Sequence, residues 1–375
     1  MSSPLGLTIK TSLDTMLVGD CIPCRYTATT SGVAGFFSEL GTCIANEIPI
    51  TGSATPDGLF YFIKTAKGTL IADRVIQTNI SWDVLNTSRF IEGKPLQEIP
   101  KMISEVLPLG RIFYSGQTYP AYKAFDLDIS TYWYFSNALP KYIGYEFLNP
   151  IIAKAYAITS ASGGNQDGSP TTWTFEGSNN ILNDTDDWMV LDTKTSQATW
   201  ATSERRLFSI PNNTSYKKYR IYITNSQSGT INASIAQLEI YSNKIIRSLS
   251  GGCAYTDANG NMSLTDKSLG AFPTNNEWDK YIVNNTLNGK ITKDNNTVWN
   301  HKTTIQNWCR ETPINGIWVN TSGSTTASNI SRMLRGYRND GWNNVNWTTS
   351  NSAYNLGFRP VLNYVETNII NEVIY

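Results

Sequence analysis

The chain has 375 residues, with 30 Lys or Arg against 30 Asp or Glu, so its formal net charge is zero. Chains of this length usually fold as two or three domains, each with its own core. A charged fraction of only 16% argues against nucleic acid as a partner, because a polyanion is bound through clustered Lys and Arg. The sequence contains no apolar run long enough to cross a membrane, so we expect no membrane insertion.

Aromatic and uncharged polar residues characterise this sequence. Aromatics make up 12% of the chain, with 11 Trp and 20 Tyr, whereas His occurs once. The segments between apolar runs are rich in Asn, Ser, Thr and Gly. This composition is typical of a β-rich protein whose surface stacks and hydrogen-bonds. Sugars fit such a surface, since aromatic rings cover their C–H faces and amides and hydroxyls pair with their hydroxyl groups.

The five cysteines are an odd number, which argues against a complete disulfide framework. Cys21 and Cys24 form a C-x-x-C motif, a pattern that occurs in redox centres and in zinc sites. With one His and no second C-x-x-C, the sequence lacks the residues for a zinc site. We interpret the cysteines as buried thiols in a β-sheet.

The N-terminal segment contains a predicted strand, a predicted helix and a predicted connector. The run YFIK, residues 61–64, is typical of a strand. Residues 81–91 begin with Ser81, a good N-cap residue, and continue with apolar residues at helical spacing. Residues 96–110 are interrupted by Pro100, so we interpret them as a connector between domains.

The middle of the chain is a series of short apolar runs separated by Gly, Pro, Asn and Asp. They recur about every ten residues and are rich in β-branched and aromatic residues, as in the strands of a sandwich or barrel. The runs are KYIGYEF (141–147), AKAYAITS (153–160), TTWTFEGS (171–178), KKYRIYIT (217–224) and AQLEIY (236–241).

The C-terminal segment contains a second predicted helix at residues 274–285. It begins with Thr274 as a possible N-cap, and Glu277 follows three residues later in the capping-box arrangement. We divide the chain into residues 1–104, 105–243 and 244–375.

Five motifs occur in order within residues 105–243: A-F-D-x-D-x-x-T-x-W, G-Y-E-F, P-x-x-W-x-F-E-G-S, Y-R-I-Y-I and L-E-I-Y. Each motif alone has little specificity, but the ordered series resembles the discoidin domain, also called the coagulation-factor type C domain. It also resembles the related galactose-binding-like carbohydrate-binding modules. The resemblance implies a jelly-roll β-sandwich, and the alternating aromatics of Y-E-F and W-T-F-E fit strands with one buried face.

The resemblance also implies a ligand site in the loops at one end of the sandwich. The His that galactose-binding members use there is missing, because the sole His301 lies outside this block. The ligand-binding candidates in the loops are Tyr119, Tyr122, Gln166, Asp167, Trp200 and Asn225. The alternative for each is a packed or solvated loop residue without a ligand.

Many relatives hold one structural Ca²⁺ near the D-x-D-x-x-T loop. The matching residues are Asp126 and Thr131, whose oxygens suit the flexible shell of this ion. The usual last ligand is a Glu in the final strand, and Gln237 stands at that position. We expect Ca²⁺ as a candidate cofactor at a site that has lost one charge. The alternative is a loop held by an Asp126 turn without a metal.

The C-terminal stretches SRMLRGYRNDGW and NLGFRPVLNY resemble the end of C-type-lectin-like folds of the formylglycine-generating-enzyme type, which phage receptor-binding proteins also use. The reactive cysteine pair of that enzyme family is missing, since no cysteine follows Cys309. The resemblance implies a buried framework of Arg335, Gly336, Gly357, Phe358 and Arg359 around an exposed binding face. Candidates on that face are Trp342, Asn344, Trp347 and Tyr354. The alternative is that the two Trp fill a small core.

We expect the two flanks to pack together, with the discoidin-like block inserted between them, because an inserted domain with adjacent termini is tolerated in an exposed loop. The predicted fold class is therefore mainly β, a discoidin-type jelly-roll sandwich plus a C-type-lectin-like α+β domain formed by the N- and C-terminal segments.

The expected function is that of a bacteriophage virion protein, a tail or fibre component that binds a host cell-surface carbohydrate. The resemblance of the flanks to prophage-encoded proteins implies other virion proteins as partners. It also implies a homo-oligomer, with a trimer favoured, in which weak single sites gain avidity. The first residues, MSSPLGLTIKTSL, lack the features of a signal peptide, which fits release by lysis and action outside the host cell.

Two further functions stay open: a glycan-binding module of a secreted bacterial protein, and a structural virion decoration protein without a ligand. We expect no enzymatic activity. A glycosidase needs two carboxylates on either side of a cleft, whereas the adjacent Asp186 and Asp187 would point to opposite faces of a strand. His301 has no G-x-S-x-G partner for a hydrolase triad.

Overall fold

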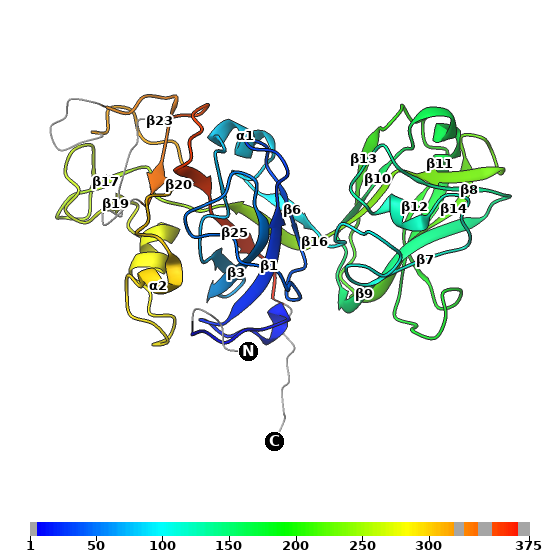
Figure 1. The fold of residues 1–375 in the computed structure, drawn as a ribbon, viewed down its shortest axis with the longest axis horizontal. Helices are drawn as coiled ribbons and strands as arrows, with labels where there is room; N and C mark the ends of the chain where they lie inside the picture. The colour runs from blue at the N-terminus through cyan, green and yellow to red at the C-terminus, as the bar shows by residue number, and fades with distance from the viewer. Residues whose placement is uncertain (1–5, 319–325, 337–346, 367–375) are drawn as a thin grey trace, which may run out of the picture. The chain divides into compact units, whose positions relative to one another are not determined.

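The computed structural model describes residues 6–318, 326–336 and 347–366 and is mainly β. The chain forms two compact units. The inserted unit is Pro95–Asn243, and the flank unit combines Met1–Lys94 with Lys244–Tyr375. The flanks therefore belong to one unit, in which the N-terminal strands β1 (Cys21–Thr27) and β3 (Asp57–Ala66) belong to the same sheet as the C-terminal strand β25 (Pro360–Asn363) (Figure 1).

Two antiparallel sheets form the inserted unit. The first has the order β12-β11-β14-β9-β7 and the second has the order β13-β10-β16, while β8 and β15 form a separate pair. The strands are β7 (Arg111–Tyr114), β8 (Trp133–Ser136), β9 (Lys141–Ile151), β10 (Ala155–Thr159), β11 (Pro170–Ser178), β12 (Met189–Lys194), β13 (Arg205–Ser209), β14 (Tyr216–Ser226), β15 (Asn232–Ile235) and β16 (Gln237–Ser248). All five apolar runs predicted in this block lie on strands, so the predicted β-sandwich is confirmed.

Aromatic side chains fill the space between these two sheets. The ring of Tyr156 on β10 stacks on Phe175 of β11 at 4.3 Å between centroids, and Phe175 in turn stacks on Tyr219 of β14. All three side chains are fully buried. Because side chains alternate along a strand, these rings point inward while their sequence neighbours point outward.

The inserted unit begins earlier than the boundary at residue 105. The chain enters it through β6 (Lys94–Gln97) and leaves it through β16, and these two strands pair with each other. Ile99 and Met102 are buried in the aromatic core of the inserted unit. The segment after Lys94 therefore packs as part of the inserted unit. The prediction of a connector, which was based on its prolines, did not indicate this packing.

The main sheet of the flank unit is antiparallel and combines strands from both ends of the chain. Its order is β2-β1-β3-β4-β25-β16. Its strands besides the end of β16 are β1 (Cys21–Thr27), β2 (Phe36–Ser38), β3 (Asp57–Ala66), β4 (Thr69–Ala72) and β25 (Pro360–Asn363). The pairing of β4 with β25, which places Ile71 opposite Val361, joins the two flanks.

The rest of the flank unit consists of short elements. The sheet β22-β20-β24-β5 again joins both flanks, through β5 (Gln77–Thr78) and β24 (Leu356–Phe358). The remaining strands are β17 (Ala254–Thr256), β18 (Met262–Ser263), β19 (Ala271–Phe272), β20 (Gln306–Trp308), β21 (Ser331–Arg332), β22 (Leu334–Arg335) and β23 (Trp347–Thr348). The C-type-lectin-like assignment of this unit stays a prediction.

Helices are short throughout the described residues. The α-helices are α1 (Trp82–Thr87) and α2 (Asn296–Trp299), the 3-10 helices are η1 (Leu13–Thr15), η2 (Ala121–Ala124) and η3 (Gly163–Gly168), and η4 (Trp278–Val283) is a π-helix. Ser81 caps α1 as predicted, by accepting a hydrogen bond from Val84 N at 3.2 Å. The helix ends at Thr87, before the predicted end, because Arg89 adopts a positive φ of 67°.

The capping box predicted for residues 274–285 is wrong. Helix η4 begins at Trp278, not after Thr274. The carboxylate of Glu277 accepts hydrogen bonds from the guanidinium of Arg247, at 2.7 Å, and from Ser250 N, at 2.9 Å. The carboxylate that the local pattern assigned to the start of the helix therefore forms a long-range ion pair with Arg247 instead.

The predicted framework residues of the C-terminal segment are buried. Arg335 and Arg359 are 2% and 1% exposed, and their guanidinium groups lie 5.4 and 5.8 Å from the ring of Trp278. A Cβ on Gly357 would lie 2.4 Å from the carbonyl oxygen of Gln77, so the pairing of β24 with β5 requires glycine there. Burial lowers the pKa of Arg359 to about 10.

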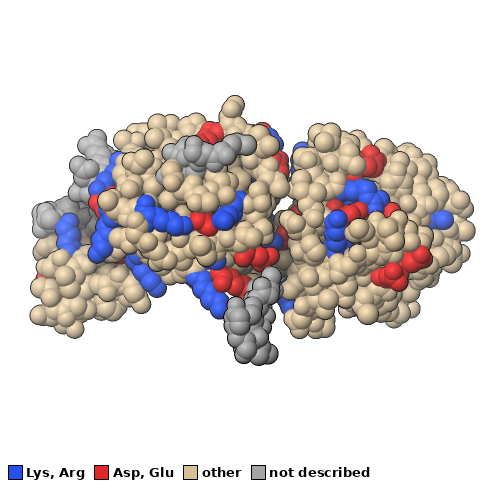
Figure 2. Space-filling model, turned by 90° about the horizontal axis from the view of Figure 1, so that it is seen from below, with Lys and Arg blue, Asp and Glu red and all other residues tan. Residues whose placement is uncertain are grey.

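Across the part of the chain that the structure describes, none of the helices is long and apolar enough to span a membrane. Figure 2 shows one face of the protein, on which charged side chains form small groups of mixed sign separated by wide uncharged areas. This distribution agrees with the equal numbers of acidic and basic residues. It offers no continuous basic surface on this face.

Candidate functional site

Three loops of the inserted unit meet at the C-terminal end of β14. The side chain of Gln227, just after β14, connects the other two loops. Its Nε2 donates to the carbonyl oxygen of Gln166 at 2.8 Å, and its Oε1 accepts from Trp200 N at 2.5 Å. The backbone of Ser228 donates to Asp167 O at 2.8 Å. The loops after β10, β12 and β14 therefore form one connected surface.

A cluster of three tyrosines lies on this surface. Trp133 on β8 is 0% exposed, and its neighbours Tyr132 and Tyr134 point to the opposite face because side chains alternate along a strand. The ring of Tyr119 lies 5.6 Å from each of their rings, measured between centroids. We call Tyr119, Tyr132 and Tyr134 the tyrosine cluster.

Neighbouring amides fix two rings of the tyrosine cluster. Asn165 Nδ2 donates to the hydroxyl of Tyr132 at 2.7 Å, and Asn232 Nδ2 donates to that of Tyr134 at 3.4 Å. Tyr119 is 44% exposed, and its backbone N–H donates to Tyr134 O. The cluster thus presents one exposed ring on two partly buried and anchored rings, bordered by amide groups.

Two of the predicted ligand residues have structural roles instead. Trp200 is 1% exposed, and its Nε1 donates to the carbonyl oxygen of Pro170 at 2.7 Å, so its prediction as a loop contact is corrected. The ring fills the core because the loop before β13 folds inward at this point. Gln166 Oε1 accepts from Thr202 Oγ1 at 2.6 Å, and its Nε2 donates to Trp200 O. This amide connects loops.

The other predicted loop residues are distributed around the same end. Asp167 is exposed in η3, and Tyr122 packs partly against the core with Lys123 Nζ 4.9 Å from its ring. Asn225 is partly buried in β14, and its Oδ1 has no hydrogen-bond partner among the described residues. Only Tyr119 of the predicted set belongs to the tyrosine cluster.

Sequence reasoning missed Tyr132, Tyr134, Asn165, Asn232 and Gln227. The first two carried a usable signal, because T-Y-W-Y-F alternates around the buried Trp133. The three amides carried none, since Asn and Gln are common in every loop of this chain. Their position depends on which loops the fold brings together.

The three predicted metal ligands do lie together. Thr131 Oγ1 donates to Asp126 Oδ2 at 2.6 Å, and Gln237 Nε2 donates to Asp126 Oδ1 at 2.9 Å. Lys123 Nζ lies 3.3 Å from Asp126 Oδ2. Within the described residues, no group of three or more His, Cys, Asp or Glu could hold a metal.

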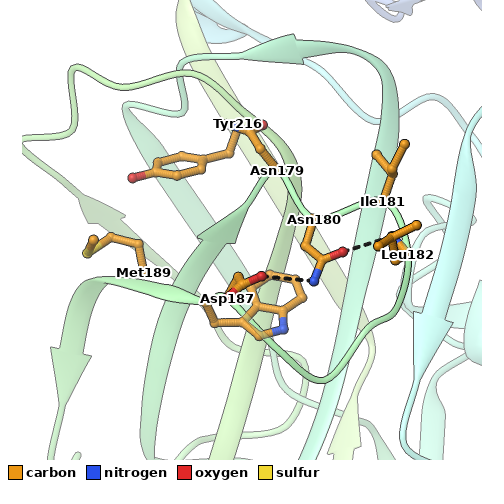
Figure 3. A pocket seen from close by; sticks show the side chains of 8 residues that line it. Asn179, Asn180, Ile181, Leu182, Asp187, Met189 and Tyr216 are labelled. Carbon is orange, nitrogen blue, oxygen red and sulfur yellow. Dashed lines mark hydrogen bonds between the residues drawn. The ribbon is translucent and has the colours of Figure 1, made fainter.

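A surface pocket of about 730 Å³ lies at the other end of β14, beside Tyr216 (Figure 3). Its polar wall is bonded internally: Asn180 Nδ2 donates to Asp187 Oδ2 at 3.0 Å, and Leu182 N donates to Asn180 Oδ1 at 2.8 Å. Leu182 is 89% exposed at the rim. The pocket has one aromatic ring from Tyr216 and one from Trp188, and it is a second candidate surface for a ligand.

The C-terminal candidates are only partly described. Trp342 and Asn344 lie outside the described residues. Trp347 belongs to β23, whose backbone pairs with β21. Tyr354 is 74% exposed. The binding face expected from these four residues stays a prediction.

The sole histidine and two of the cysteines are buried side chains of the flank unit. His301 is 3% exposed with its Nε2 2.7 Å from Asp294 Oδ1, and burial lowers its pKa. Cys24 is buried between strands, and burial raises its pKa well above that of a free thiol. Burial likewise raises the pKa of Cys43 to about 12. Such thiols stay protonated and are weak nucleophiles.

The inserted unit is thus an antiparallel β-sandwich with an aromatic cluster among the loops at one end. No family model and no curated protein matches the chain. Among solved structures, it is similar to a family 32 carbohydrate-binding module of Clostridium perfringens NanJ in complex with galactose. The identity is 20% and the TM-score 0.30, covering 36% of this chain and 93% of that one.

Two further similar structures cover the same share of this chain. One is CpGH89CBM32-5 from Clostridium perfringens in complex with GalNAc-β-1,3-galactose, at 15% identity, a TM-score of 0.31 and 95% coverage of that chain. The other is an F5/8 type C domain from Bacteroides fragilis, at 15% identity, a TM-score of 0.31 and 91% coverage of that chain.

Proposed function

We propose that the inserted unit binds a carbohydrate through the tyrosine cluster, and that the protein is a binding protein without catalytic activity. The observation that carries this proposal is the exposed ring of Tyr119, 5.6 Å from two rings that amides hold in place. An aromatic face covers the C–H face of a pyranose ring. The amides and hydroxyls beside it supply directional hydrogen bonds.

The side chains that border the tyrosine cluster are uncharged, which favours a neutral glycan over an anionic one. The tyrosine cluster is bordered by Asn165, Asn232 and Ser228, and Ser228 Oγ donates to Asn232 Oδ1. The network is partly pre-formed, so little conformational entropy is lost on binding. A shallow site of this kind suits a terminal sugar or a short glycan segment, with modest affinity for each site.

The test is a glycan array with the full chain, followed by titration of any glycan bound. Tyr119→Ala removes the exposed ring and should weaken binding by about tenfold or more, since an aromatic contact contributes roughly 1 kcal/mol beyond its buried area. Tyr216→Ala is the matched control, because this ring lies at the opposite end of β14 in the surface pocket. It should leave affinity unchanged.

The reverse result would overturn this assignment. If Tyr216→Ala abolished binding and Tyr119→Ala did not, the glycan site would be the surface pocket beside Asn180 and Trp188. If the array and purified bacterial cell walls both showed no binding, the carbohydrate-binding function itself would be rejected.

We further propose that this binding serves a bacteriophage tail or fibre component, acting outside the host cell as a homo-oligomer, with a trimer favoured. The likeness of the C-terminal sequence stretches to phage receptor-binding folds supports this setting. Weak individual sites, as expected here, become effective when an oligomer presents several copies to one surface. Immunogold labelling of virions should then mark the tail, and adsorption to host cells should fall with Tyr119→Ala.

Two other settings would give different results. A glycan-binding module of a secreted bacterial protein would be found in the culture medium without particles. A structural decoration protein would label the virion, but Tyr119→Ala would not affect adsorption.

A further inference from the structure

The loop between η2 and β8 surrounds a polar centre in the inserted unit. Four groups supply its oxygen atoms: the carboxylate of Asp126, the hydroxyl of Thr131, and the backbone carbonyl groups of Asp128 and of Lys123 in η2. Asp126 is 5% exposed. Oxygen atoms of these types are the ligands that Ca²⁺ accepts.

The amide nitrogen of Gln237 lies at this centre. It is within hydrogen-bonding distance of Asp126 Oδ1 at 2.9 Å and of the carbonyl oxygens of Lys123 and Asp128, both at 3.3 Å. Gln237 is 4% exposed at the start of β16, which holds it in place. One nitrogen with two N–H groups therefore faces three acceptors, in the position that a cation coordinated by these oxygens would need.

The orientation of the amide is determined by its other atom. Gln237 Oε1 accepts a hydrogen bond from Leu127 N at 3.1 Å. If the amide were rotated to direct Oε1 at the centre, its NH₂ group would face the N–H of Leu127. Oε1 would at the same time face three acceptors. A buried N–H without an acceptor is unfavourable, so the observed orientation is strongly preferred.

The remaining charge of the centre is also balanced without a metal. Lys123 Nζ lies 3.3 Å from Asp126 Oδ2, and the hydroxyl of Thr131 donates to the same oxygen at 2.6 Å. The carboxylate of Asp128 is directed away, where it accepts from Ser130 N and Ser130 Oγ. Asp126 is thus the one carboxylate at the centre, and it has an ammonium partner.

We propose that the amide of Gln237 replaces the calcium ion implied by the resemblance, so that this loop is held without a metal. The donor set observed here does not fit Ca²⁺, because an N–H donor points at the oxygens that would coordinate the ion. The same geometry implies that the cation site is latent. Gln237→Glu would remove the amide N–H groups from the position between the oxygen atoms and add a second carboxylate there.

The thermal midpoint of the full chain, measured in EDTA and in millimolar Ca²⁺, tests this proposal. The wild-type protein should have the same midpoint in both. Gln237→Glu should lower the midpoint in EDTA by about 4 °C or more, because two carboxylates then face each other. Millimolar Ca²⁺ should restore most of this loss, since an ion that binds the folded state stabilises it.

Two further variants make the result specific. Asp126→Asn, added to Gln237→Glu, should abolish the response to Ca²⁺, which places the ion at this centre. Gln197→Glu is the matched control, because Gln197 lies in the loop between β12 and β13 and donates to Thr195 O. It adds a carboxylate to the same unit and should give no response to Ca²⁺.

Two outcomes would overturn the proposal. One is a wild-type midpoint that rises in Ca²⁺ and loses this rise with Asp126→Ala. The other is a Gln237→Glu protein that is as stable as the wild type in EDTA and indifferent to Ca²⁺. If Gln237→Glu fails to fold in EDTA, refolding it from urea with and without Ca²⁺ decides the matter. Recovery of native tryptophan fluorescence only with Ca²⁺ supports the proposal, and equal failure in both contradicts it.

Discussion

Arg206 shows how single side chains hold the loop that precedes β13. Its guanidinium lies 4.0 Å from the ring of Trp200, donates to Ala198 O and Thr199 O at 2.8 Å each, and forms an ion pair with Glu204 at 2.7 Å. Glu204 also accepts from Ala201 N at 2.7 Å. The buried ring and the exposed ion pair thus fix the same loop from its two sides.

The ion pair makes a pH-dependent contribution to stability. The hydrogen bond from Arg206, together with that from Ala201 N, lowers the pKa of Glu204 to about 2. A carboxyl group with a lowered folded-state pKa stabilises the protein above its ordinary pKa near 4.5, and this contribution disappears as the pH falls toward 2. Glu204→Gln should therefore cost less than about 1 kcal/mol at neutral pH, as expected for a partly exposed pair.

Urea unfolding of the wild type and of Glu204→Gln at a series of pH values measures this effect. The difference in unfolding free energy should shrink between pH 4.5 and about 2. Arg206→Ala in the wild type should remove most of the same pH dependence. A difference that stays constant over this range would show that the carboxylate is not stabilised by its partners.

Residue-level prediction from the sequence succeeded where a local rule decides the outcome. The cap at Ser81 follows from its local sequence, whereas the burial of Arg335 and Arg359 was expected from the resemblance of the C-terminal stretches. It failed for Trp200, because whether a loop tryptophan is exposed depends on the loops folded over it. A search of the sequence by strand alternation would have added Tyr132 and Tyr134 to the candidates.

Among elements, strands were easier to predict than helices. The apolar runs form strands because their side chains alternate between the core and the solvent, with a period of two residues. Helix η4 began later than its capping pattern indicated, since Glu277 pairs with Arg247 from a distant strand. The connections between loops, such as Gln227 to Gln166, have no local pattern and were not predictable.

Gln227 provides a test of the idea that the three loops act as one element. Gln227→Ala leaves Trp200 N without its acceptor and the carbonyl oxygen of Gln166 with Ser169 N as its remaining donor, which should cost about 1–3 kcal/mol of stability. Hydrogen exchange should speed up in η3 and in the loop that contains Trp200. Glycan affinity should also fall, although Gln227 is outside the tyrosine cluster, because Asn165 would be less well held.

Gln197→Ala is the control for this prediction, since the Gln197 amide donates to Thr195 O within its own loop. It should leave exchange in η3 and glycan affinity unchanged. Faster exchange confined to the loop of Gln227 itself would show that the three loops move independently.

For the whole molecule, the main feature is that the flank unit is completed by the last part of the chain. β4 pairs with β25, β5 pairs with β24, and Trp278 and Trp299 share a core with Tyr61 and Ile63. The inserted unit, in contrast, contains both of its sheets and its aromatic core between Pro95 and Asn243. Sequence motifs identified the inserted block, whereas its exact start required the packing of Ile99 and Met102.

This organisation predicts different outcomes for two fragments. Residues 95–243 alone should fold and unfold cooperatively, because the β6–β16 pairing keeps the two ends of the unit adjacent. Residues 1–243 should contain the same folded unit, but with the N-terminal flank unfolded or aggregated, since the edge of β4 and the buried face of β3 would be uncovered. Near-ultraviolet circular dichroism, proteolysis and size-exclusion chromatography distinguish these states.

Co-expression of residues 244–375 should restore solubility by supplying β24 and β25. A protease-resistant N-terminal flank in the fragment 1–243 would contradict this organisation, because it would show that β1 to β5 form a domain without the C-terminal strands.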